Sequence, residues 1–247
     1  MKRLIPILML IPLGCSSCGF RHDLREAINQ YNKDREPQLI AVCDTVATIP
    51  DNRIINEGRY ELLTVDGAIS VCMSPDCQEA RVEADPKDLN RVSFYVGTDA
   101  NSLLIDYTGR RTGTCRPIRV YLPQSSTLYK VELDGASRFE GTLTTNRTEC
   151  FVSADGASTA VVDLGSDIYR VQVECDGASK VIVRGEAVLV DAEVDGASHA
   201  DLSGLQVQRA HMEMYGAASA KVNASVSIYG EMEGASHLKY VGSPELL

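Results

Sequence analysis

The residues best suited to chemistry in this chain are carboxylates that recur at regular spacing. Of the 34 Asp and Glu residues, eleven fall on alternate positions of one repeated phrase: Glu132, Asp134, Asp155, Glu174, Asp176, Asp191, Glu193, Asp195, Glu213, Glu231 and Glu233. Carboxylates stacked about 5 Å apart repel one another by about 1 kcal/mol per pair in water. Calcium ions prefer several oxygen ligands and would offset this repulsion. The candidate calcium ligands are Asp134, Asp155, Asp176 and Asp195.

A second interpretation of the same acids requires no metal. An Asp directly before a Gly can hydrogen-bond the turning backbone, and the rest of the acidic face is then simply solvated. The glycine-rich nonapeptide that binds calcium in other β-helices, G-G-x-G-x-D, is absent from the sequence. We therefore expect no cofactor and keep calcium as the alternative.

Neither catalysis nor nucleic-acid binding is indicated by these residues. A glycan-cleaving site needs a pair of acids, or a base beside a cationic clamp, in a groove. Repeated acids define no single constellation of this kind, and the shared face of His199 and Asp201 is a spacing that occurs by chance. The formal net charge of −10, without a basic stripe, argues against a nucleic-acid partner.

Six cysteines follow the N-terminal segment, and they suggest structure rather than metal binding. Cys72 and Cys77 flank a Ser-Pro-Asp turn and are the disulfide candidates, which leaves Cys43 and Cys115 as a further pair. Cys150 and Cys175 fall four residues apart along neighbouring repeats, too far for a bridge, so we expect two buried free thiols. The sequence has no C-x-x-C motif of the kind that binds zinc.

A repeat of about twenty residues must position the acids. The phrase Asp-Gly-Ala-Ser, or a close variant, recurs around six glycines with successive spacings of 21, 21, 19, 20 and 18: Gly135, Gly156, Gly177, Gly196, Gly216 and Gly234. A fixed period in this range indicates a solenoid. Alternation of apolar and polar residues indicates strands, so the predicted fold is an all-β solenoid of single-stranded coils. The glycines form its corners because Gly adopts positive φ without steric cost.

The alternation also predicts which side chains face the core. Positions two, four and six before each corner Gly are almost wholly apolar, as in Leu133, Val131 and Tyr129. In the last coil, Met232 occupies the position two residues before the Gly, in the same column as Leu133. Positions one and three before each Gly are mainly acidic and are expected to face water. The fourth residue after each Gly is apolar again, which gives every coil a second core-facing strand.

The region before the regular repeats carries related signals. Val65-Asp66-Gly67-Ala68 matches the repeated corner, four further segments read as strands, and residues 84–92 read as a turn or short helix. We divide the chain into a signal peptide (1–17), a tether or short helix (18–38), an N-terminal cap with irregular coils (39–128) and the regular solenoid (129–247) continuous with it.

The first residues resemble the export signal of a bacterial lipoprotein. Lys2 and Arg3 precede an apolar stretch too short to span a bilayer stably, and small residues then precede two cysteines. Ser16 and Ser17 suit cleavage before Cys18, with Cys15 as the alternative acylation site. An ordinary secretory signal is the remaining interpretation. Lipidation would anchor the protein to a membrane rather than make it span one.

The order of these segments, followed by the iterated DGAS corners, resembles a bacterial family described as "putative auto-transporter adhesin, head GIN domain". The resemblance covers roughly residues 60–245, and a related toast-rack family of solenoids is a second match. The family is common among lipoproteins of gut Bacteroidetes, and it implies a right-handed β-solenoid (β-helix) on the envelope with no established catalytic residues. This chain departs from the family's corner at Ala218, Tyr215 and Glu233.

These observations together predict a non-catalytic lipoprotein of the outer membrane, facing either the cell surface or the periplasm. Its expected role is that of an adhesin or ligand-presenting scaffold with a glycan or protein ligand. The alternative is a periplasmic structural or envelope accessory protein, and a carbohydrate-active enzyme is the least favoured. Open strand edges at the solenoid ends permit association, which Pro244 is expected to discourage by ending the last coil.

Overall fold

The computed structural model describes residues 42–43, 46–48, 53–97, 101–109, 116–165 and 167–247. The proposed signal peptide (1–17), the tether (18–38), Cys15, Cys18 and Cys115 lie outside these ranges. Residues Pro37–Leu247 form one unit, to which the following description applies. None of the helices in the described ranges is long and apolar enough to cross a membrane.

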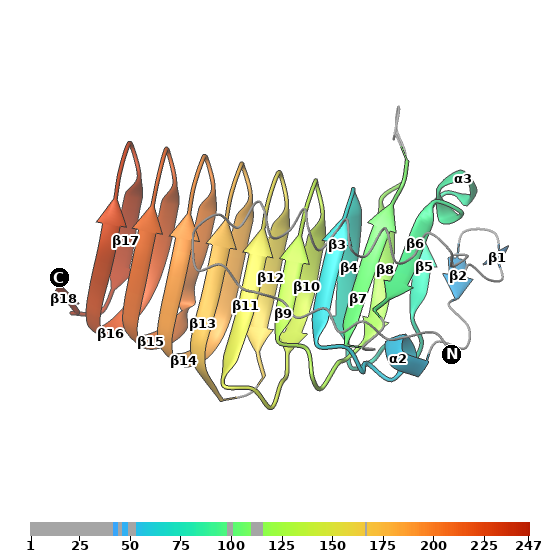
Figure 1. Ribbon diagram of the computed structural model, residues 1–247, viewed down its shortest axis with the longest axis horizontal. Coiled ribbons are helices and arrows are strands. Elements are labelled where there is room, and N and C mark those ends of the chain that lie inside the picture. Colours follow the sequence, from blue (N-terminus) through green and yellow to red (C-terminus); the bar gives the residue numbers. More distant parts are fainter. Residues whose placement is uncertain (1–41, 44–45, 49–52, 98–100, 110–115, 166) are drawn as a thin grey trace, which may run out of the picture. The chain divides into compact units, whose positions relative to one another are not determined.

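The chain forms a β-solenoid of about 6 turns with coils of about 21 residues, which confirms the predicted fold class (Figure 1). Each coil passes once through each of two facing sheets and turns between them at the glycine corner. Strands of successive coils pair in parallel, and residues at equivalent positions around the corners stack in columns. The pairings of β14 with β15 and of β15 with β16 shift register at irregularities away from the corners.

Sheet 1 contains the strands that lead into the corners. Its regular part begins with β3 (Leu62–Asp66), β9 (Lys130–Leu133), β11 (Glu149–Ala154) and β13 (Ile168–Cys175). It continues through the second halves of β14 (Lys180–Val194), β15 (His199–Met214) and β16 (Ser219–Met232), and β18 (Glu245–Leu246) pairs with β16.

Sheet 2 contains the strands that leave the corners. It runs through β4 (Ile69–Ser74), β10 (Arg138–Leu143), β12 (Thr159–Leu164), the first halves of β14, β15 and β16, and β17 (His237–Val241). In the later coils, one long strand therefore bends from sheet 2 into sheet 1, where the sequence suggested two separate strands.

Antiparallel strands cover the N-terminal end of the solenoid. In sheet 1, β7 (Ser102–Tyr107) pairs with β3 and is flanked by antiparallel β6 (Val92–Val96). In sheet 2, β8 (Ile118–Pro123) pairs with β4, and antiparallel β5 (Arg81–Glu83), β2 (Val46–Thr48) and β1 (Val42–Cys43) follow. Helices α2 (Arg53–Asn56) and α3 (Pro86–Leu89) join these strands.

The core lies between the two sheets and largely follows the predicted columns. Leu133, Ala154, Cys175, Val194 and Met214 are all buried in one of them. Two predictions at the ends of the columns are wrong. Tyr129 is half-buried, because Leu128 fills the core at the start of this coil, and Met232 is 48% exposed, because no described strand covers the edge on which it lies.

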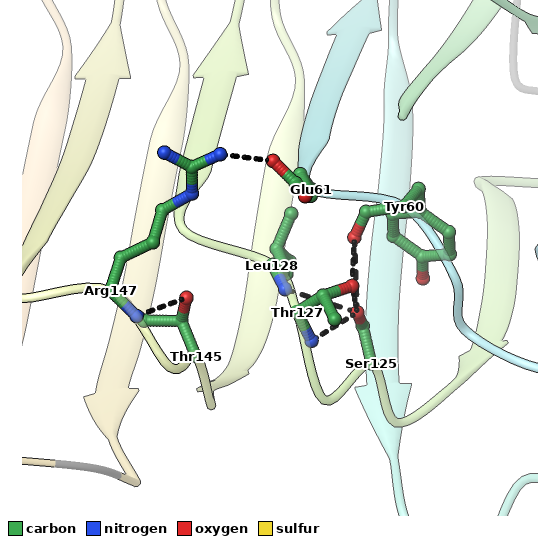
Figure 2. A network of polar contacts seen from close by, with 7 residues as sticks. All are labelled: Tyr60, Glu61, Ser125, Thr127, Leu128, Thr145 and Arg147. Carbon is green, nitrogen blue, oxygen red and sulfur yellow. Dashed lines mark hydrogen bonds and ion pairs between the residues drawn. The ribbon is translucent and has the colours of Figure 1, made fainter. Parts of the chain in front are cut away.

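A polar junction fixes the first regular coil to the preceding segment. Ser125 is buried, and its Oγ donates a hydrogen bond to the carbonyl of Gly58 at 2.6 Å or of Tyr60 at 3.1 Å. The same Oγ accepts the backbone N–H groups of Thr127 and Leu128 (Figure 2). One side chain thus satisfies backbone groups that would otherwise be buried without partners at an irregular turn.

Pro244 does not end the sheet as the sequence suggested. The chain continues beyond it into β18, whose residues pair with Ser227 and Ile228 of β16. Pro244 lies in the bend between β17 and β18, where the N–H that proline lacks is not needed by a strand ladder.

Candidate binding face

The outer surface of sheet 1 carries most of the acids singled out from the sequence. We call this surface the ladder face and define it by four outward columns on the strands β9, β11, β13, β14, β15 and β16. On the coil of β11, from the corner downward, these columns contain Asp155, which directly follows the strand, and then Ser153, Phe151 and Glu149. Parallel pairing repeats these positions on the neighbouring coils. The repeat thereby converts a sequence spacing of about twenty residues into neighbouring side chains.

The second column is a run of four glutamates. Glu174 aligns with Glu193, Glu193 with Glu213, and Glu213 with Glu231. Partial burial, together with the charges of Glu174 and Glu213, raises the pKa of Glu193. The stacking therefore places these carboxylates close enough for each to oppose the ionisation of the next.

The first part of this column differs from the prediction that it faces water. Glu132 and Ser153 are both buried. Thr64 Oγ1 donates a hydrogen bond to Glu132, and Lys130 Nζ lies 2.8 Å from a Glu132 oxygen. Lys130 and Thr64, which come from the same and the preceding coil, thus compensate this acid. Farther along the column, the Ser153 hydroxyl donates to Glu174 and His211 lies beside Glu213.

The four candidate calcium ligands bond to their own corners. In each case the Asp Oδ1 accepts the backbone N–H of the glycine that follows, at 2.5 Å: Asp134, Asp155, Asp176 and Asp195. Within the described ranges, no group of three or more His, Cys, Asp and Glu side chains is arranged to hold a metal ion. The geometry matches the turn-capping interpretation, and calcium binding stays a prediction.

A connected cluster centred on the third column spans four consecutive coils, from β13 to β16. Asp191 forms an ion pair with the Arg170 guanidinium and lies 3.4 Å from Nδ1 of His211. His211 Nε2 lies 3.4 Å from Glu213, and the His211 ring stacks on Tyr229 with ring centroids 4.8 Å apart. The hydrogen bond with Asp191 raises the pKa of Arg170.

Aromatic and basic side chains gather at the N-terminal end of the ladder face. The Arg147 guanidinium forms an ion pair with Glu61 at 2.5 Å (Figure 2). It also lies 4.2 Å from the ring centroid of Tyr129. Tyr129 meets Phe151 edge to face, with centroids 6.0 Å apart. Sequence reasoning missed this group because it assigned Tyr129 to the core; the alternation that places Phe151 outside was the available signal.

Several other singled-out residues lie away from the ladder face. His199 is on sheet 2, with Nδ1 2.8 Å from the Ser219 hydroxyl, and the neighbouring Asp201 interacts with Ser203 and Lys221 rather than with a histidine. Tyr107, at the end of β7, is buried, and its hydroxyl donates a hydrogen bond to Asp88 at 2.9 Å.

All four cysteines whose side chains are described are free thiols. Cys150 and Cys175 are buried as expected, and burial raises the pKa of Cys150 to about 12. The disulfide candidates Cys72 and Cys77 are not joined: Cys72 points outward from β4, and the Cys77 thiol donates to the Glu79 carbonyl at 3.1 Å. Their pairing stays a prediction.

One solved structure of low sequence identity agrees with the fold. A crystal structure of a putative adhesin from Bacteroides fragilis matches 76% of this chain and 92% of its own, with 12% identity and a TM-score of 0.56. One from Parabacteroides merdae, also described as a putative adhesin, matches 82% and 94%, with 14% identity and a TM-score of 0.49. No functionally curated protein matches the sequence.

The family comparison rests on sequence rather than on shape. The model of the family described as "Putative auto-transporter adhesin, head GIN domain" matches residues 59–244, which include the complete series of stacked corners. The chain belongs to this family of β-solenoid proteins.

Proposed function

We propose that this protein is a non-catalytic adhesin of the bacterial envelope that contacts its ligand through the ladder face. The observation that carries the proposal is the in-register repetition of outward side chains over successive coils. An array of side chains at regular spacing offers many weak contacts, which suits an extended or multivalent ligand. Membership of an adhesin family supports the same role.

The ligand class that best fits this face is a glycan or a polar protein surface. A carboxylate beside a half-buried histidine ring and an exposed tyrosine ring, as at Glu213, His211 and Tyr229, can accept hydroxyl hydrogen bonds while a ring covers an apolar sugar face. The test is adherence of cells carrying the whole protein to glycan arrays and to host cells. Changing Tyr229 and Phe151 to Ala should weaken adherence, while the matched change of Tyr95 on β6 should not. Equal adherence of all variants would contradict a role for the ladder face.

Membrane attachment through an acylated cysteine belongs to the same proposal. The support is the signal-like N-terminus, in which Ser16 and Ser17 precede Cys18. Metabolic labelling with a fatty acid should mark the wild type and Cys15→Ser but not Cys18→Ser. Label retained in Cys18→Ser and lost in Cys15→Ser would move the anchor to Cys15, and unlabelled wild type would contradict lipidation.

A further inference from the structure

Exposed apolar side chains concentrate at the last coil. Of the eight large hydrophobic residues that are exposed in the described ranges, all but Tyr169 lie between Val226 and Leu247. Met232 is 48% exposed and Tyr240 is 47% exposed, whereas their column neighbours one coil earlier, Met214 and Val222, are fully buried. The last coil therefore presents core positions to solvent, which is typical of a surface that another chain covers.

The strand edges at this coil are unpaired as well. β17 pairs with residues 219–223 of β16, and β18 pairs only with residues 227–228. In the described chain, Gly230, Glu231 and Met232 have no strand beyond them. These edges border a cavity of about 330 Å³ whose lining includes Met212, Met232, Leu238, Tyr240, Leu246 and Leu247. Backbone groups beside an apolar cavity are suited to strand addition.

We propose that this end is the interface of a symmetric dimer, in which a second copy of the chain supplies the missing strands. A two-fold axis parallel to the strands would place β17 of one copy antiparallel to residues 229–233 of the other and join the two cores. Such an interface is closed and self-complementary, so it gives a dimer rather than a fibre.

The charges of the last coil support this arrangement. Glu231 and Glu233 point outward where β16 enters the last corner, and His237 and Lys239 point outward from β17, which leaves this corner. All four side chains are exposed. The proposed axis brings Lys239 beside Glu231 of the second copy and His237 beside Glu233. The other two-fold axis, perpendicular to the sheets, would pair β17 with itself and bring the two copies of Lys239 together, which is unfavourable.

Sedimentation of the whole purified protein over a wide range of concentration tests the interface. We expect a monomer–dimer equilibrium that Lys239→Glu or Glu231→Lys weakens about tenfold, since each change creates two symmetric like-charge contacts. The double variant K239E/E231K should restore dimerisation. Glu213→Lys is the matched control, because it alters the same glutamate column one coil earlier, and it should leave the equilibrium unchanged.

Two results would overturn the proposal. One is a monomer at every concentration, which would leave the apolar end to another occupant or to none. The other is a dimer that is insensitive to both charge reversals, which would place the contact elsewhere. Circular dichroism of each variant separates loss of association from loss of fold.

Discussion

At the scale of single residues, the corner glycines satisfy two requirements at once. Gly156 has φ of +71°, and a Cβ atom on it would lie 2.6 Å from the carbonyl oxygen of Gly135 in the preceding coil. The same carbonyl accepts the N–H of Ala157. A side chain would therefore strain its own backbone and also push apart the hydrogen bond that stacks the coils.

Replacing Gly156 by Ala should consequently destabilise the protein by about 3 kcal/mol or more, through strained φ and steric overlap together. Gly204 is the matched control, because its φ is not positive and an added Cβ would meet only the flexible side chain of Arg184 at 3.0 Å. Gly204→Ala should cost less than about 1 kcal/mol. Urea unfolding of both variants measures the difference, and equal losses would contradict the corner argument.

The residues that sequence reasoning placed correctly are those that local rules determine. Alternation alone positions Val152 and Val173 inside, and the Asp-Gly-Ala-Ser phrase marks each corner. The burial of Glu132 could not be predicted in this way, because it depends on Thr64 and Lys130, and Thr64 is 68 residues away in sequence. Tyr129 was misplaced because the junction around Ser125 shifts the core position to Leu128.

At the scale of the elements, the glutamate column has an electrostatic cost that pH should reveal. The folded state raises the pKa of Glu193 above its unfolded value, so this group favours the folded protein in its protonated form. The stability that protonated Glu193 contributes is therefore lost as the pH rises from the unfolded-state pKa toward the folded-state pKa of this residue. At neutral pH, the destabilisation by the ionised Glu193 carboxylate is present in full.

Neutralising this residue should relieve the cost. We predict that Glu193→Gln raises the melting temperature slightly at pH 7, by the equivalent of less than about 1 kcal/mol because the side chain is partly exposed. The advantage should disappear when the pH falls below the ordinary range of glutamate. Glu186→Gln is the control, since Glu186 aligns with Gln206 rather than with an acid. A gain that persists at low pH would have a cause other than ionisation.

The corner aspartates lead to a separate prediction about metal. Since each Asp carboxylate already accepts the glycine N–H of its own corner, we expect EDTA to leave the melting midpoint unchanged. Added calcium should have no effect beyond ordinary ionic screening of the exposed carboxylates. A midpoint that falls with EDTA and recovers with calcium, but not with equal ionic strength of a monovalent salt, would favour the alternative in which calcium binds between coils.

At the scale of the whole molecule, the solenoid explains why the fold was predictable and the ligand was not. Each coil contacts mainly its neighbours, so one repeated phrase determines the architecture several times over. The proposed recognition would depend on the outward positions, such as Phe151, Gln172, Asp191 and His211 in one column. These residues differ from coil to coil because the fold does not constrain them. The antiparallel strands at the N-terminal end likewise lie outside the repeat, and their pairing is not encoded in its period.

The proposed role also requires that the ladder face be accessible from outside the cell. Protease treatment of intact cells, followed by an immunoblot, tests this requirement directly, with a periplasmic protein as the control for lysis. We expect the signal from this protein to be lost while the periplasmic control survives. Full protection of the protein in intact cells, with digestion only after lysis, would contradict a surface adhesin and favour a periplasmic accessory role.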